Sequence, residues 1–119
     1  MKHLQALLNI QTNFEIDCIV ACDTDSNVLD SIRLNGIERY QHPETLVETF
    51  QLDAVIIATP DGSHYELGKQ FLSQGVDVFV EKPLATTFDH ASSLVSLSIE
   101  EGKVLKSGFL LRFHPCIQQ

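Results

Sequence analysis

The sequence contains no tryptophan, only one methionine, and half as many basic residues as acidic ones: eight lysines and arginines against sixteen aspartates and glutamates. The resulting net charge is −8, and no stretch gathers lysine and arginine. Nucleic acids and anionic membranes attract proteins of the opposite charge, so we expect neither as a partner. No apolar run approaches the roughly 20 residues of a transmembrane helix. The N-terminus, Met-Lys-His-Leu-Gln, lacks the apolar core of a signal peptide.

Cysteine is scarce as well. Of the three cysteines, Cys18 and Cys22 lie four residues apart in an apolar stretch, and Cys116 lies far along the chain. An odd number at these spacings favours free, packed thiols over a disulfide or a metal site, with Cys18 and Cys22 on one face of a strand. Free thiols predict a reducing compartment, which we take to be the cytoplasm.

What is present suits a folded soluble domain with one core: 44% of the residues are hydrophobic and 20% are charged. Helical and strand-like hydrophobic spacings alternate along the chain. Helices are expected over 2–11, 28–34, 43–50, 64–74 and 87–101, and strands over 16–22, 37–41, 53–59, 76–80 and 104–109. This order predicts an α/β fold with a doubly wound, Rossmann-like parallel sheet. The strands that contain Val20, Val55, Val78 and Leu105 are expected to lie in one sheet layer, with helices on both faces of that layer.

A run of motifs begins at Asp53 and makes the pattern specific. It comprises Asp53-Ala-Val-Ile-Ile-Ala-Thr-Pro60, His64, Gly75, Glu81-Lys82-Pro83 at the end of a strand, Leu84-Ala85-Thr86, Gly108-Phe109, Arg112 and Pro115. With these motifs the chain resembles the family of glucose–fructose oxidoreductase, inositol dehydrogenase and the rhizopine-catabolism protein (Gfo/Idh/MocA). The resemblance implies an NAD(P)-dependent oxidoreductase that transfers hydride to or from a sugar, polyol or similar small molecule.

The family's dinucleotide fingerprint, Gly-x-Gly-x-x-Gly, is not in this sequence. By the resemblance its third glycine would stand just before Met1, so we expect the sheet to lack its first strand and the Gly-rich loop that holds a pyrophosphate. The strands containing Val20 and Val55 should then not pair directly. Residues 1–108 are expected to form a partial dinucleotide-binding domain, and 109–119 the start of a substrate domain. Alone, this chain is expected to be inactive and to self-associate through exposed strand edges.

Three polar segments, Asp23, Thr59-Pro60 and Glu81-Lys82-Pro83, fall at the carboxyl ends of predicted strands, where open α/β sheets bind their ligands. A carboxylate at Asp23 is placed to accept hydrogen bonds from the adenosine ribose, which favours NAD over NADP. The alternative for Asp23 is a turn or helix cap, although Asp25 or Ser26 suits the cap better.

The resemblance gives Lys82 the catalytic role, because an ammonium there can bind a substrate hydroxyl and favour the developing alkoxide. Glu81 would orient Lys82 or its backbone, and Pro83 would fix the turn. The alternative is a solvated surface lysine. His64 begins a helix beside the Thr59-Pro60 loop, so we expect a structural or cofactor-binding role and not a general base. In the family, that base belongs to a later motif that is absent here.

A second class of function stays open on the sequence alone. The chain could be a non-catalytic Rossmann-like module that binds another chain. The DNA upstream of Met1 discriminates the two classes, because an in-frame strand ending in Gly-x-Gly-x-x-Gly would favour the oxidoreductase.

Overall fold

The computed structural model describes residues 2–109. The chain divides into two compact units, Met1–Gln51 and Leu52–Gln119. Apolar side chains are buried in both units, and the single core that the sequence predicted stays a prediction. No helix in the described part of the chain is long and apolar enough to cross a membrane.

The first unit holds a two-stranded parallel sheet and three helices. Its elements are α1 (Lys2–Ile10), β1 (Val20–Cys22), α2 (Ser26–Ser31), β2 (Glu38–Tyr40) and α3 (Pro43–Thr49). β1 pairs with β2 in a register that sets Val20 opposite Glu38 and Cys22 opposite Tyr40. The buried side chains of this unit are Ile19, Leu29, Ile32, Ile37 and Leu46.

Local chemistry sets the ends of these elements. The Asp25 side chain accepts a hydrogen bond from the Asn27 N–H and so caps α2, as the sequence predicted for Asp25 or Ser26. α2 ends earlier than predicted, because Ile32 is already extended (φ −72°, ψ 102°). Pro43 occupies the first turn of α3, where its missing N–H has no intrahelical partner to lose. The predicted strand over 16–22 is also shorter, since only Val20–Cys22 pairs.

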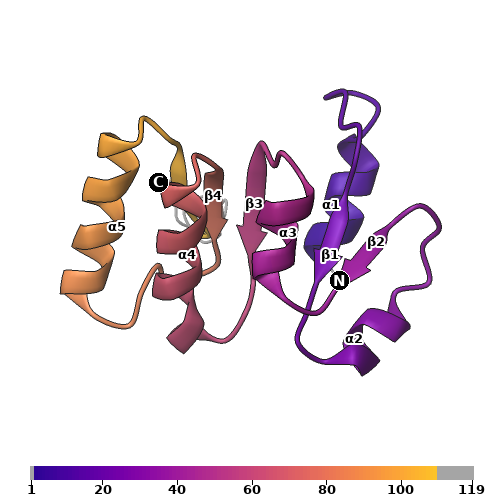
Figure 1. Ribbon diagram of the computed structural model, residues 1–119, viewed down its shortest axis with the longest axis horizontal. Helices are drawn as coiled ribbons and strands as arrows, with labels where there is room; N and C mark the ends of the chain where they lie inside the picture. Colours follow the sequence, from indigo (N-terminus) through magenta and orange to yellow (C-terminus); the bar gives the residue numbers. More distant parts are fainter. Residues whose placement is uncertain (1, 110–119) are drawn as a thin grey trace, which may run out of the picture. The chain divides into compact units, whose positions relative to one another are not determined.

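The second unit holds a three-stranded parallel sheet in the order β3-β4-β5 (Figure 1). Its strands are β3 (Ala54–Ile57), β4 (Asp77–Val80) and β5 (Leu105–Ser107). Between them lie the short 3₁₀ helix η1 (Asp61–Ser63), α4 (His64–Ser73) and α5 (Phe88–Glu100). Ile57, Val80 and Ser107 share one register position near the carboxyl ends of the strands. Gly75 (φ 73°) and Gly102 (φ 62°) follow the two helices with positive φ, as expected for glycines that terminate helices.

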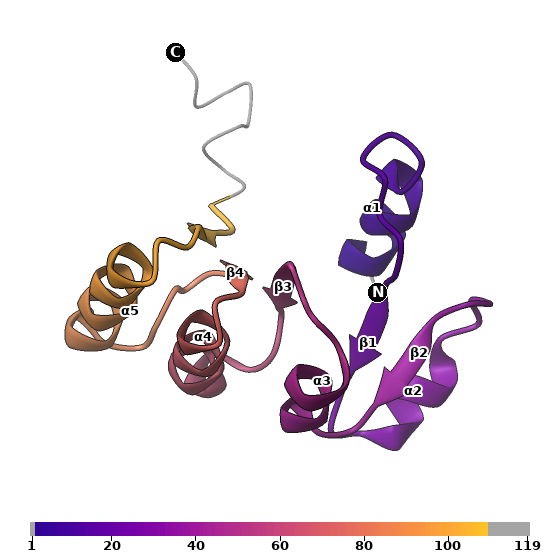
Figure 2. The same ribbon diagram turned by 45° about the horizontal axis from the view of Figure 1, so that its top comes forward.

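Both helices of this unit cover the same face of the sheet, as Figure 2 shows for α4 and α5. Two right-handed crossovers that move along the sheet in the same direction place their helices on one side. The buried side chains between sheet and helices include Phe71, Leu72, Val78, Val80 and Leu94, each at most 2% exposed. Burying such a side chain stabilises the fold by about 1.5–3 kcal/mol.

The strands form two separate hydrogen-bonded sheets, because no described strand pairs with both β1 and β3. The helices of the second unit lie on one face of β3-β4-β5. The single layer with helices on both of its faces stays a prediction. The narrower prediction for Val20 and Val55 is confirmed: their strands do not pair with each other. The α/β class and the parallel pairing are confirmed as well.

Candidate functional site

The segment that follows β4 carries Glu81, Lys82 and Pro83. The Glu81 N–H donates to the Ile57 carbonyl (2.9 Å), so the ladder between β3 and β4 continues one residue past β4. The Lys82 N–H donates to the Glu81 carboxylate oxygen Oε2 (3.2 Å). The Lys82–Pro83 peptide bond is cis, and the Lys82 side chain is exposed. The chain thus places an ammonium group at the carboxyl end of the sheet.

The segment that follows β3 is tied together by a serine. Ser63 Oγ lies 2.6 Å from Thr59 Oγ1 and 2.7 Å from the Pro60 carbonyl oxygen, within hydrogen-bonding distance of both. The Ser63 N–H also donates to the Pro60 carbonyl (2.9 Å). These contacts close the loop between β3 and α4, and Thr59 and Pro60 are left at the surface.

His64 joins the two segments. Its side chain is 1% exposed. Nδ1 lies 2.7 Å from the Pro83 carbonyl oxygen, and Nε2 lies 2.8 Å from the Thr59 carbonyl oxygen. Both oxygens are acceptors, so a neutral ring donates to one of them at a time and a protonated ring donates to both. The sequence predicted that these two loops converge, and within this unit they do.

Asp23 belongs to the first unit and directly follows β1. Its N–H donates to the Tyr40 carbonyl (3.1 Å), and its carboxylate oxygen Oδ1 accepts from the Asp25 N–H (2.9 Å). One oxygen of Asp23 therefore shapes the turn, while the helix cap belongs to Asp25. The convergence of Asp23 with the loops of the second unit stays a prediction.

The two described cysteines are free thiols in different surroundings. Cys18 is exposed and lies before β1, so it does not share a strand face with Cys22 as the sequence had predicted. Burial, together with the negative charges of Asp23 and Glu44, raises the pKa of the Cys22 thiol. Because the thiolate is the nucleophile, Cys22 is less reactive at neutral pH than an exposed thiol.

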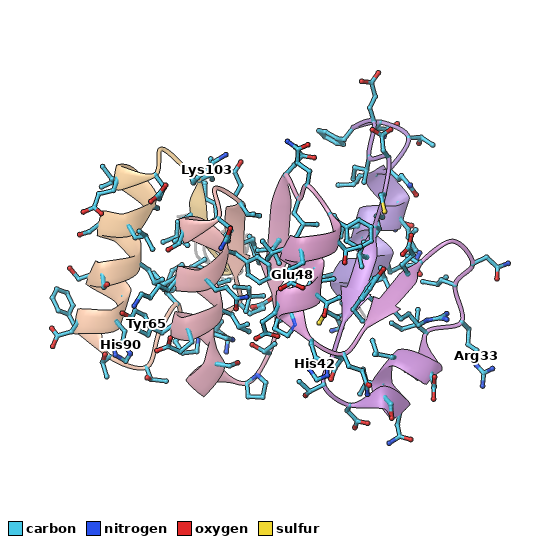
Figure 3. All side chains as sticks on the ribbon, in the orientation of Figure 1. Arg33, His42, Glu48, Tyr65, His90 and Lys103 are labelled. Carbon is cyan, nitrogen blue, oxygen red and sulfur yellow. The ribbon has the colours of Figure 1, made fainter. Side chains whose placement is uncertain are left out.

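His42 and His90 are exposed. His90, near the start of α5, stacks on Tyr65 of α4 with ring centroids 3.9 Å apart (Figure 3). Arg112 and His114 lie outside the described residues. Residues 2–109 contain no group of three histidines, cysteines or acidic residues arranged to hold a metal ion.

Parallel strands joined by helices, with polar loops at the carboxyl ends of β3 and β4, define a nucleotide-binding α/β domain of the Rossmann class. Residues 1–109 match the family model described as "Oxidoreductase family, NAD-binding Rossmann fold" (GFO_IDH_MocA). The chain belongs to this family, as its motifs had indicated.

Known relatives agree with this assignment. The chain is 33% identical over 81 residues to scyllo-inositol 2-dehydrogenase (NAD(+)) of Bacillus subtilis, covering 67% of this chain and 24% of that protein. A dehydrogenase structure from Chromobacterium violaceum matches with a TM-score of 0.79 and 30% identity, covering 98% of this chain and 34% of that one. The WlbA dehydrogenase from Bordetella pertussis, in complex with NADH and UDP-GlcNAcA, matches with a TM-score of 0.79 and 25% identity, over 84% and 29% of the two chains. The chain therefore spans about a quarter of its first curated relatives.

Two residues of the site escaped the sequence analysis. Ser63 was not singled out, because a serine before a helix usually acts as a cap, and here its hydroxyl points back to Thr59 and Pro60. Gly108 was noted only as part of a motif, although it lies against the Glu81 carboxylate. Its position directly after the last strand was the available signal.

Proposed function

We propose that this chain is the nucleotide-binding part of an oxidoreductase that transfers hydride between NAD and a sugar, polyol or related substrate in the cytoplasm. The observation that carries the proposal is the pair of close contacts that the two ring nitrogens of His64 make with the Thr59 and Pro83 carbonyl oxygens, at 2.8 and 2.7 Å. They hold two loops together at the carboxyl end of one sheet, where this fold binds its ligands. Lys82 stands exposed on one of these loops.

In this proposal Lys82 is the catalytic residue. Its ammonium donates a hydrogen bond to the reacting hydroxyl of the substrate, and its charge favours the alkoxide that develops as hydride leaves. The bound nicotinamide supplies the hydride acceptor or donor. Glu81 holds the Lys82 N–H, which fixes the backbone from which the ammonium extends.

The remaining residues would bind and orient the cofactor. Thr59 and Pro60 present the loop after β3, and Pro83 sets the turn after β4. His64 keeps the two loops at a fixed separation, because both of its ring nitrogens already face their carbonyl oxygens. Residues 109–119 would open the substrate domain, and the remainder of that domain would supply the acid–base group.

The proposal is tested with the longest open reading frame that contains this chain. We expect in-frame sequence upstream of Met1 that encodes a strand ending in Gly-x-Gly-x-x-Gly. We further expect the encoded protein to reduce NAD with at least one inositol or sugar, and the 119-residue chain alone to show no turnover. Stop codons directly upstream, together with no binding of NADH by the encoded protein, would contradict the proposal.

We expect the full-length protein to prefer NAD, and Asp23→Asn to narrow that preference for NAD over NADP by roughly tenfold. The Asp23 carboxylate would repel the 2′-phosphate of NADP at close range. Asparagine removes the charge and keeps a side-chain oxygen that can accept the Asp25 N–H, so the turn stays intact. The measurement is the ratio of kcat/KM for the two cofactors. Asp30→Asn, an exposed position on α2, is the control for net charge and should leave the ratio unchanged. A wild-type preference for NADP would overturn the assignment of Asp23.

A second candidate function is a non-catalytic module that associates through strand edges, with another copy of this chain as the first partner to test. The supporting observation is that, among the described strands, β3 pairs only with β4 and β1 only with β2. An open strand edge is a template for pairing with another chain. Dimers or larger species of the 119-residue chain in sedimentation, together with stop codons directly upstream of Met1, would favour this candidate, because a truncated dinucleotide-binding domain should also associate through its open edges. A monomer would count against it.

A further inference from the structure

The position of Gly108 does not need glycine for backbone reasons. Gly108 directly follows β5, and its N–H donates to the Val80 carbonyl (2.9 Å), which continues the ladder between β4 and β5. Its φ lies outside the left-handed region that Gly36, Gly75 and Gly102 occupy. Alanine could therefore adopt the same backbone conformation, and any requirement for glycine comes from the surrounding space.

That space is taken by a carboxylate. A Cβ built on Gly108 would lie 2.8 Å from Glu81 Oε2 and 3.2 Å from Glu81 Cδ. It would also lie 3.3 Å from Phe79 Cζ, so the added methyl group would be crowded by the ring as well. A separation of 2.8 Å between non-bonded heavy atoms of this kind is repulsive. Gly108 itself is buried.

The same oxygen, Glu81 Oε2, accepts the hydrogen bond from the Lys82 N–H (3.2 Å). The backbone of Glu81 extends the pairing between β3 and β4, because the Glu81 N–H donates to the Ile57 carbonyl (2.9 Å). One carboxylate oxygen, Oε2, thus lies close to both the Gly108 backbone and the Lys82 N–H. A methyl group at position 108 would overlap this oxygen, so the carboxylate would have to leave the position from which it accepts the Lys82 N–H.

We propose that Gly108 is a positioning residue for Lys82: its lack of a side chain leaves room for the Glu81 carboxylate, which holds the Lys82 backbone. Gly108 acts through Glu81 and touches no reacting group. The consequence for hydride transfer rests on the function proposed above, whereas the arrangement of these three residues does not.

The test measures amide hydrogen exchange at Lys82 by NMR in the 119-residue chain, without cofactor. Gly108→Ala should accelerate exchange at Lys82 by about tenfold, because the hydrogen bond to the charged acceptor is lost. Glu81→Ala should accelerate it to a similar extent. Adding Gly108→Ala to Glu81→Ala should then change exchange at Lys82 no further, since two substitutions that act through one contact are not additive.

A matched control comes from Gly68 of α4. A Cβ there would lie 3.2 Å from Leu94 Cδ2, so Gly68→Ala also crowds a buried glycine, but against an apolar side chain. It should alter stability without changing exchange at Lys82. Unchanged Lys82 exchange in Gly108→Ala, or additive effects in the double variant, would overturn the proposal.

Loss of folding is informative too. If Gly108→Ala fails to fold, the double variant with Glu81→Ala should fold, because the added methyl group then meets no carboxylate. Failure of both to fold would overturn the proposal, since the cost would arise elsewhere. If exchange behaves as expected but Lys82→Ala leaves kcat intact in the full-length enzyme, the proposed function fails and the role of Gly108 in holding the Lys82 backbone stands.

Discussion

Lys82→Ala should lower the kcat of the full-length enzyme by about 10²–10³, or roughly 3–4 kcal/mol of transition-state stabilisation, while NAD affinity falls little. The ammonium's attraction to the substrate oxygen grows as negative charge develops there, whereas the hydrogen bond that we also expect between Lys82 and the nicotinamide ribose would already be present in the ground state. Steady-state kcat and KM, together with NADH binding by fluorescence, separate the two effects.

Lys82→Arg should restore little of this loss, because the planar guanidinium keeps the charge but cannot occupy the same compact position. Lys69→Ala is the control for net charge. Lys69 is exposed on α4 with its ammonium 5.9 Å from the Tyr65 ring centroid, and its loss should leave kcat unchanged. A Lys82→Ala enzyme with wild-type kcat would show that Lys82 is a solvated surface residue.

His64→Ala should lower the free energy of unfolding by about 2–4 kcal/mol. The substitution leaves a cavity at a position that is 1% exposed, and it removes the hydrogen-bonding partner of the Thr59 and Pro83 carbonyls. Urea denaturation of the 119-residue chain, followed by circular dichroism, measures the difference.

His90→Ala is the matched control for His64. It also removes a histidine near the start of a helix, but His90 is exposed and its main contact is the stacking on Tyr65. We expect a loss of no more than about 1 kcal/mol for His90→Ala. Equal losses in the two variants would mean that the contacts of His64 with the two loops contribute nothing to stability.

Much of the second unit follows from its sequence. The apolar, β-branched run after Asp53 and the glycines at 75 and 102 delimit β3, α4 and α5 to within about two residues, because burial and helix termination are local properties. The resemblance located Lys82 at the end of a strand, and the structure places it there.

Other features depend on contacts that spacing does not encode. The stretch over 16–22 has the composition of a strand, yet only Val20–Cys22 finds a partner, since pairing depends on how far β2 extends. The prediction for His64 left a structural and a cofactor-binding role open. Only coordinates show that both ring nitrogens face backbone carbonyls. Gly108 likewise acquires a role only when Glu81 is seen to lie over it.

The spatial order β3-β4-β5 repeats the order along the chain, and this has a consequence for synthesis on the ribosome. β4 and β5 each pair with the strand made just before them, so the contacts join segments that are close in sequence. Sheets with such local pairing lose less chain entropy per contact and fold faster than those that await a distant segment. β3, α4 and β4 can therefore assemble while β5 is still inside the ribosome. Chains that end after α5, once released from the ribosome, should already resist proteolysis across Ala54–Val80.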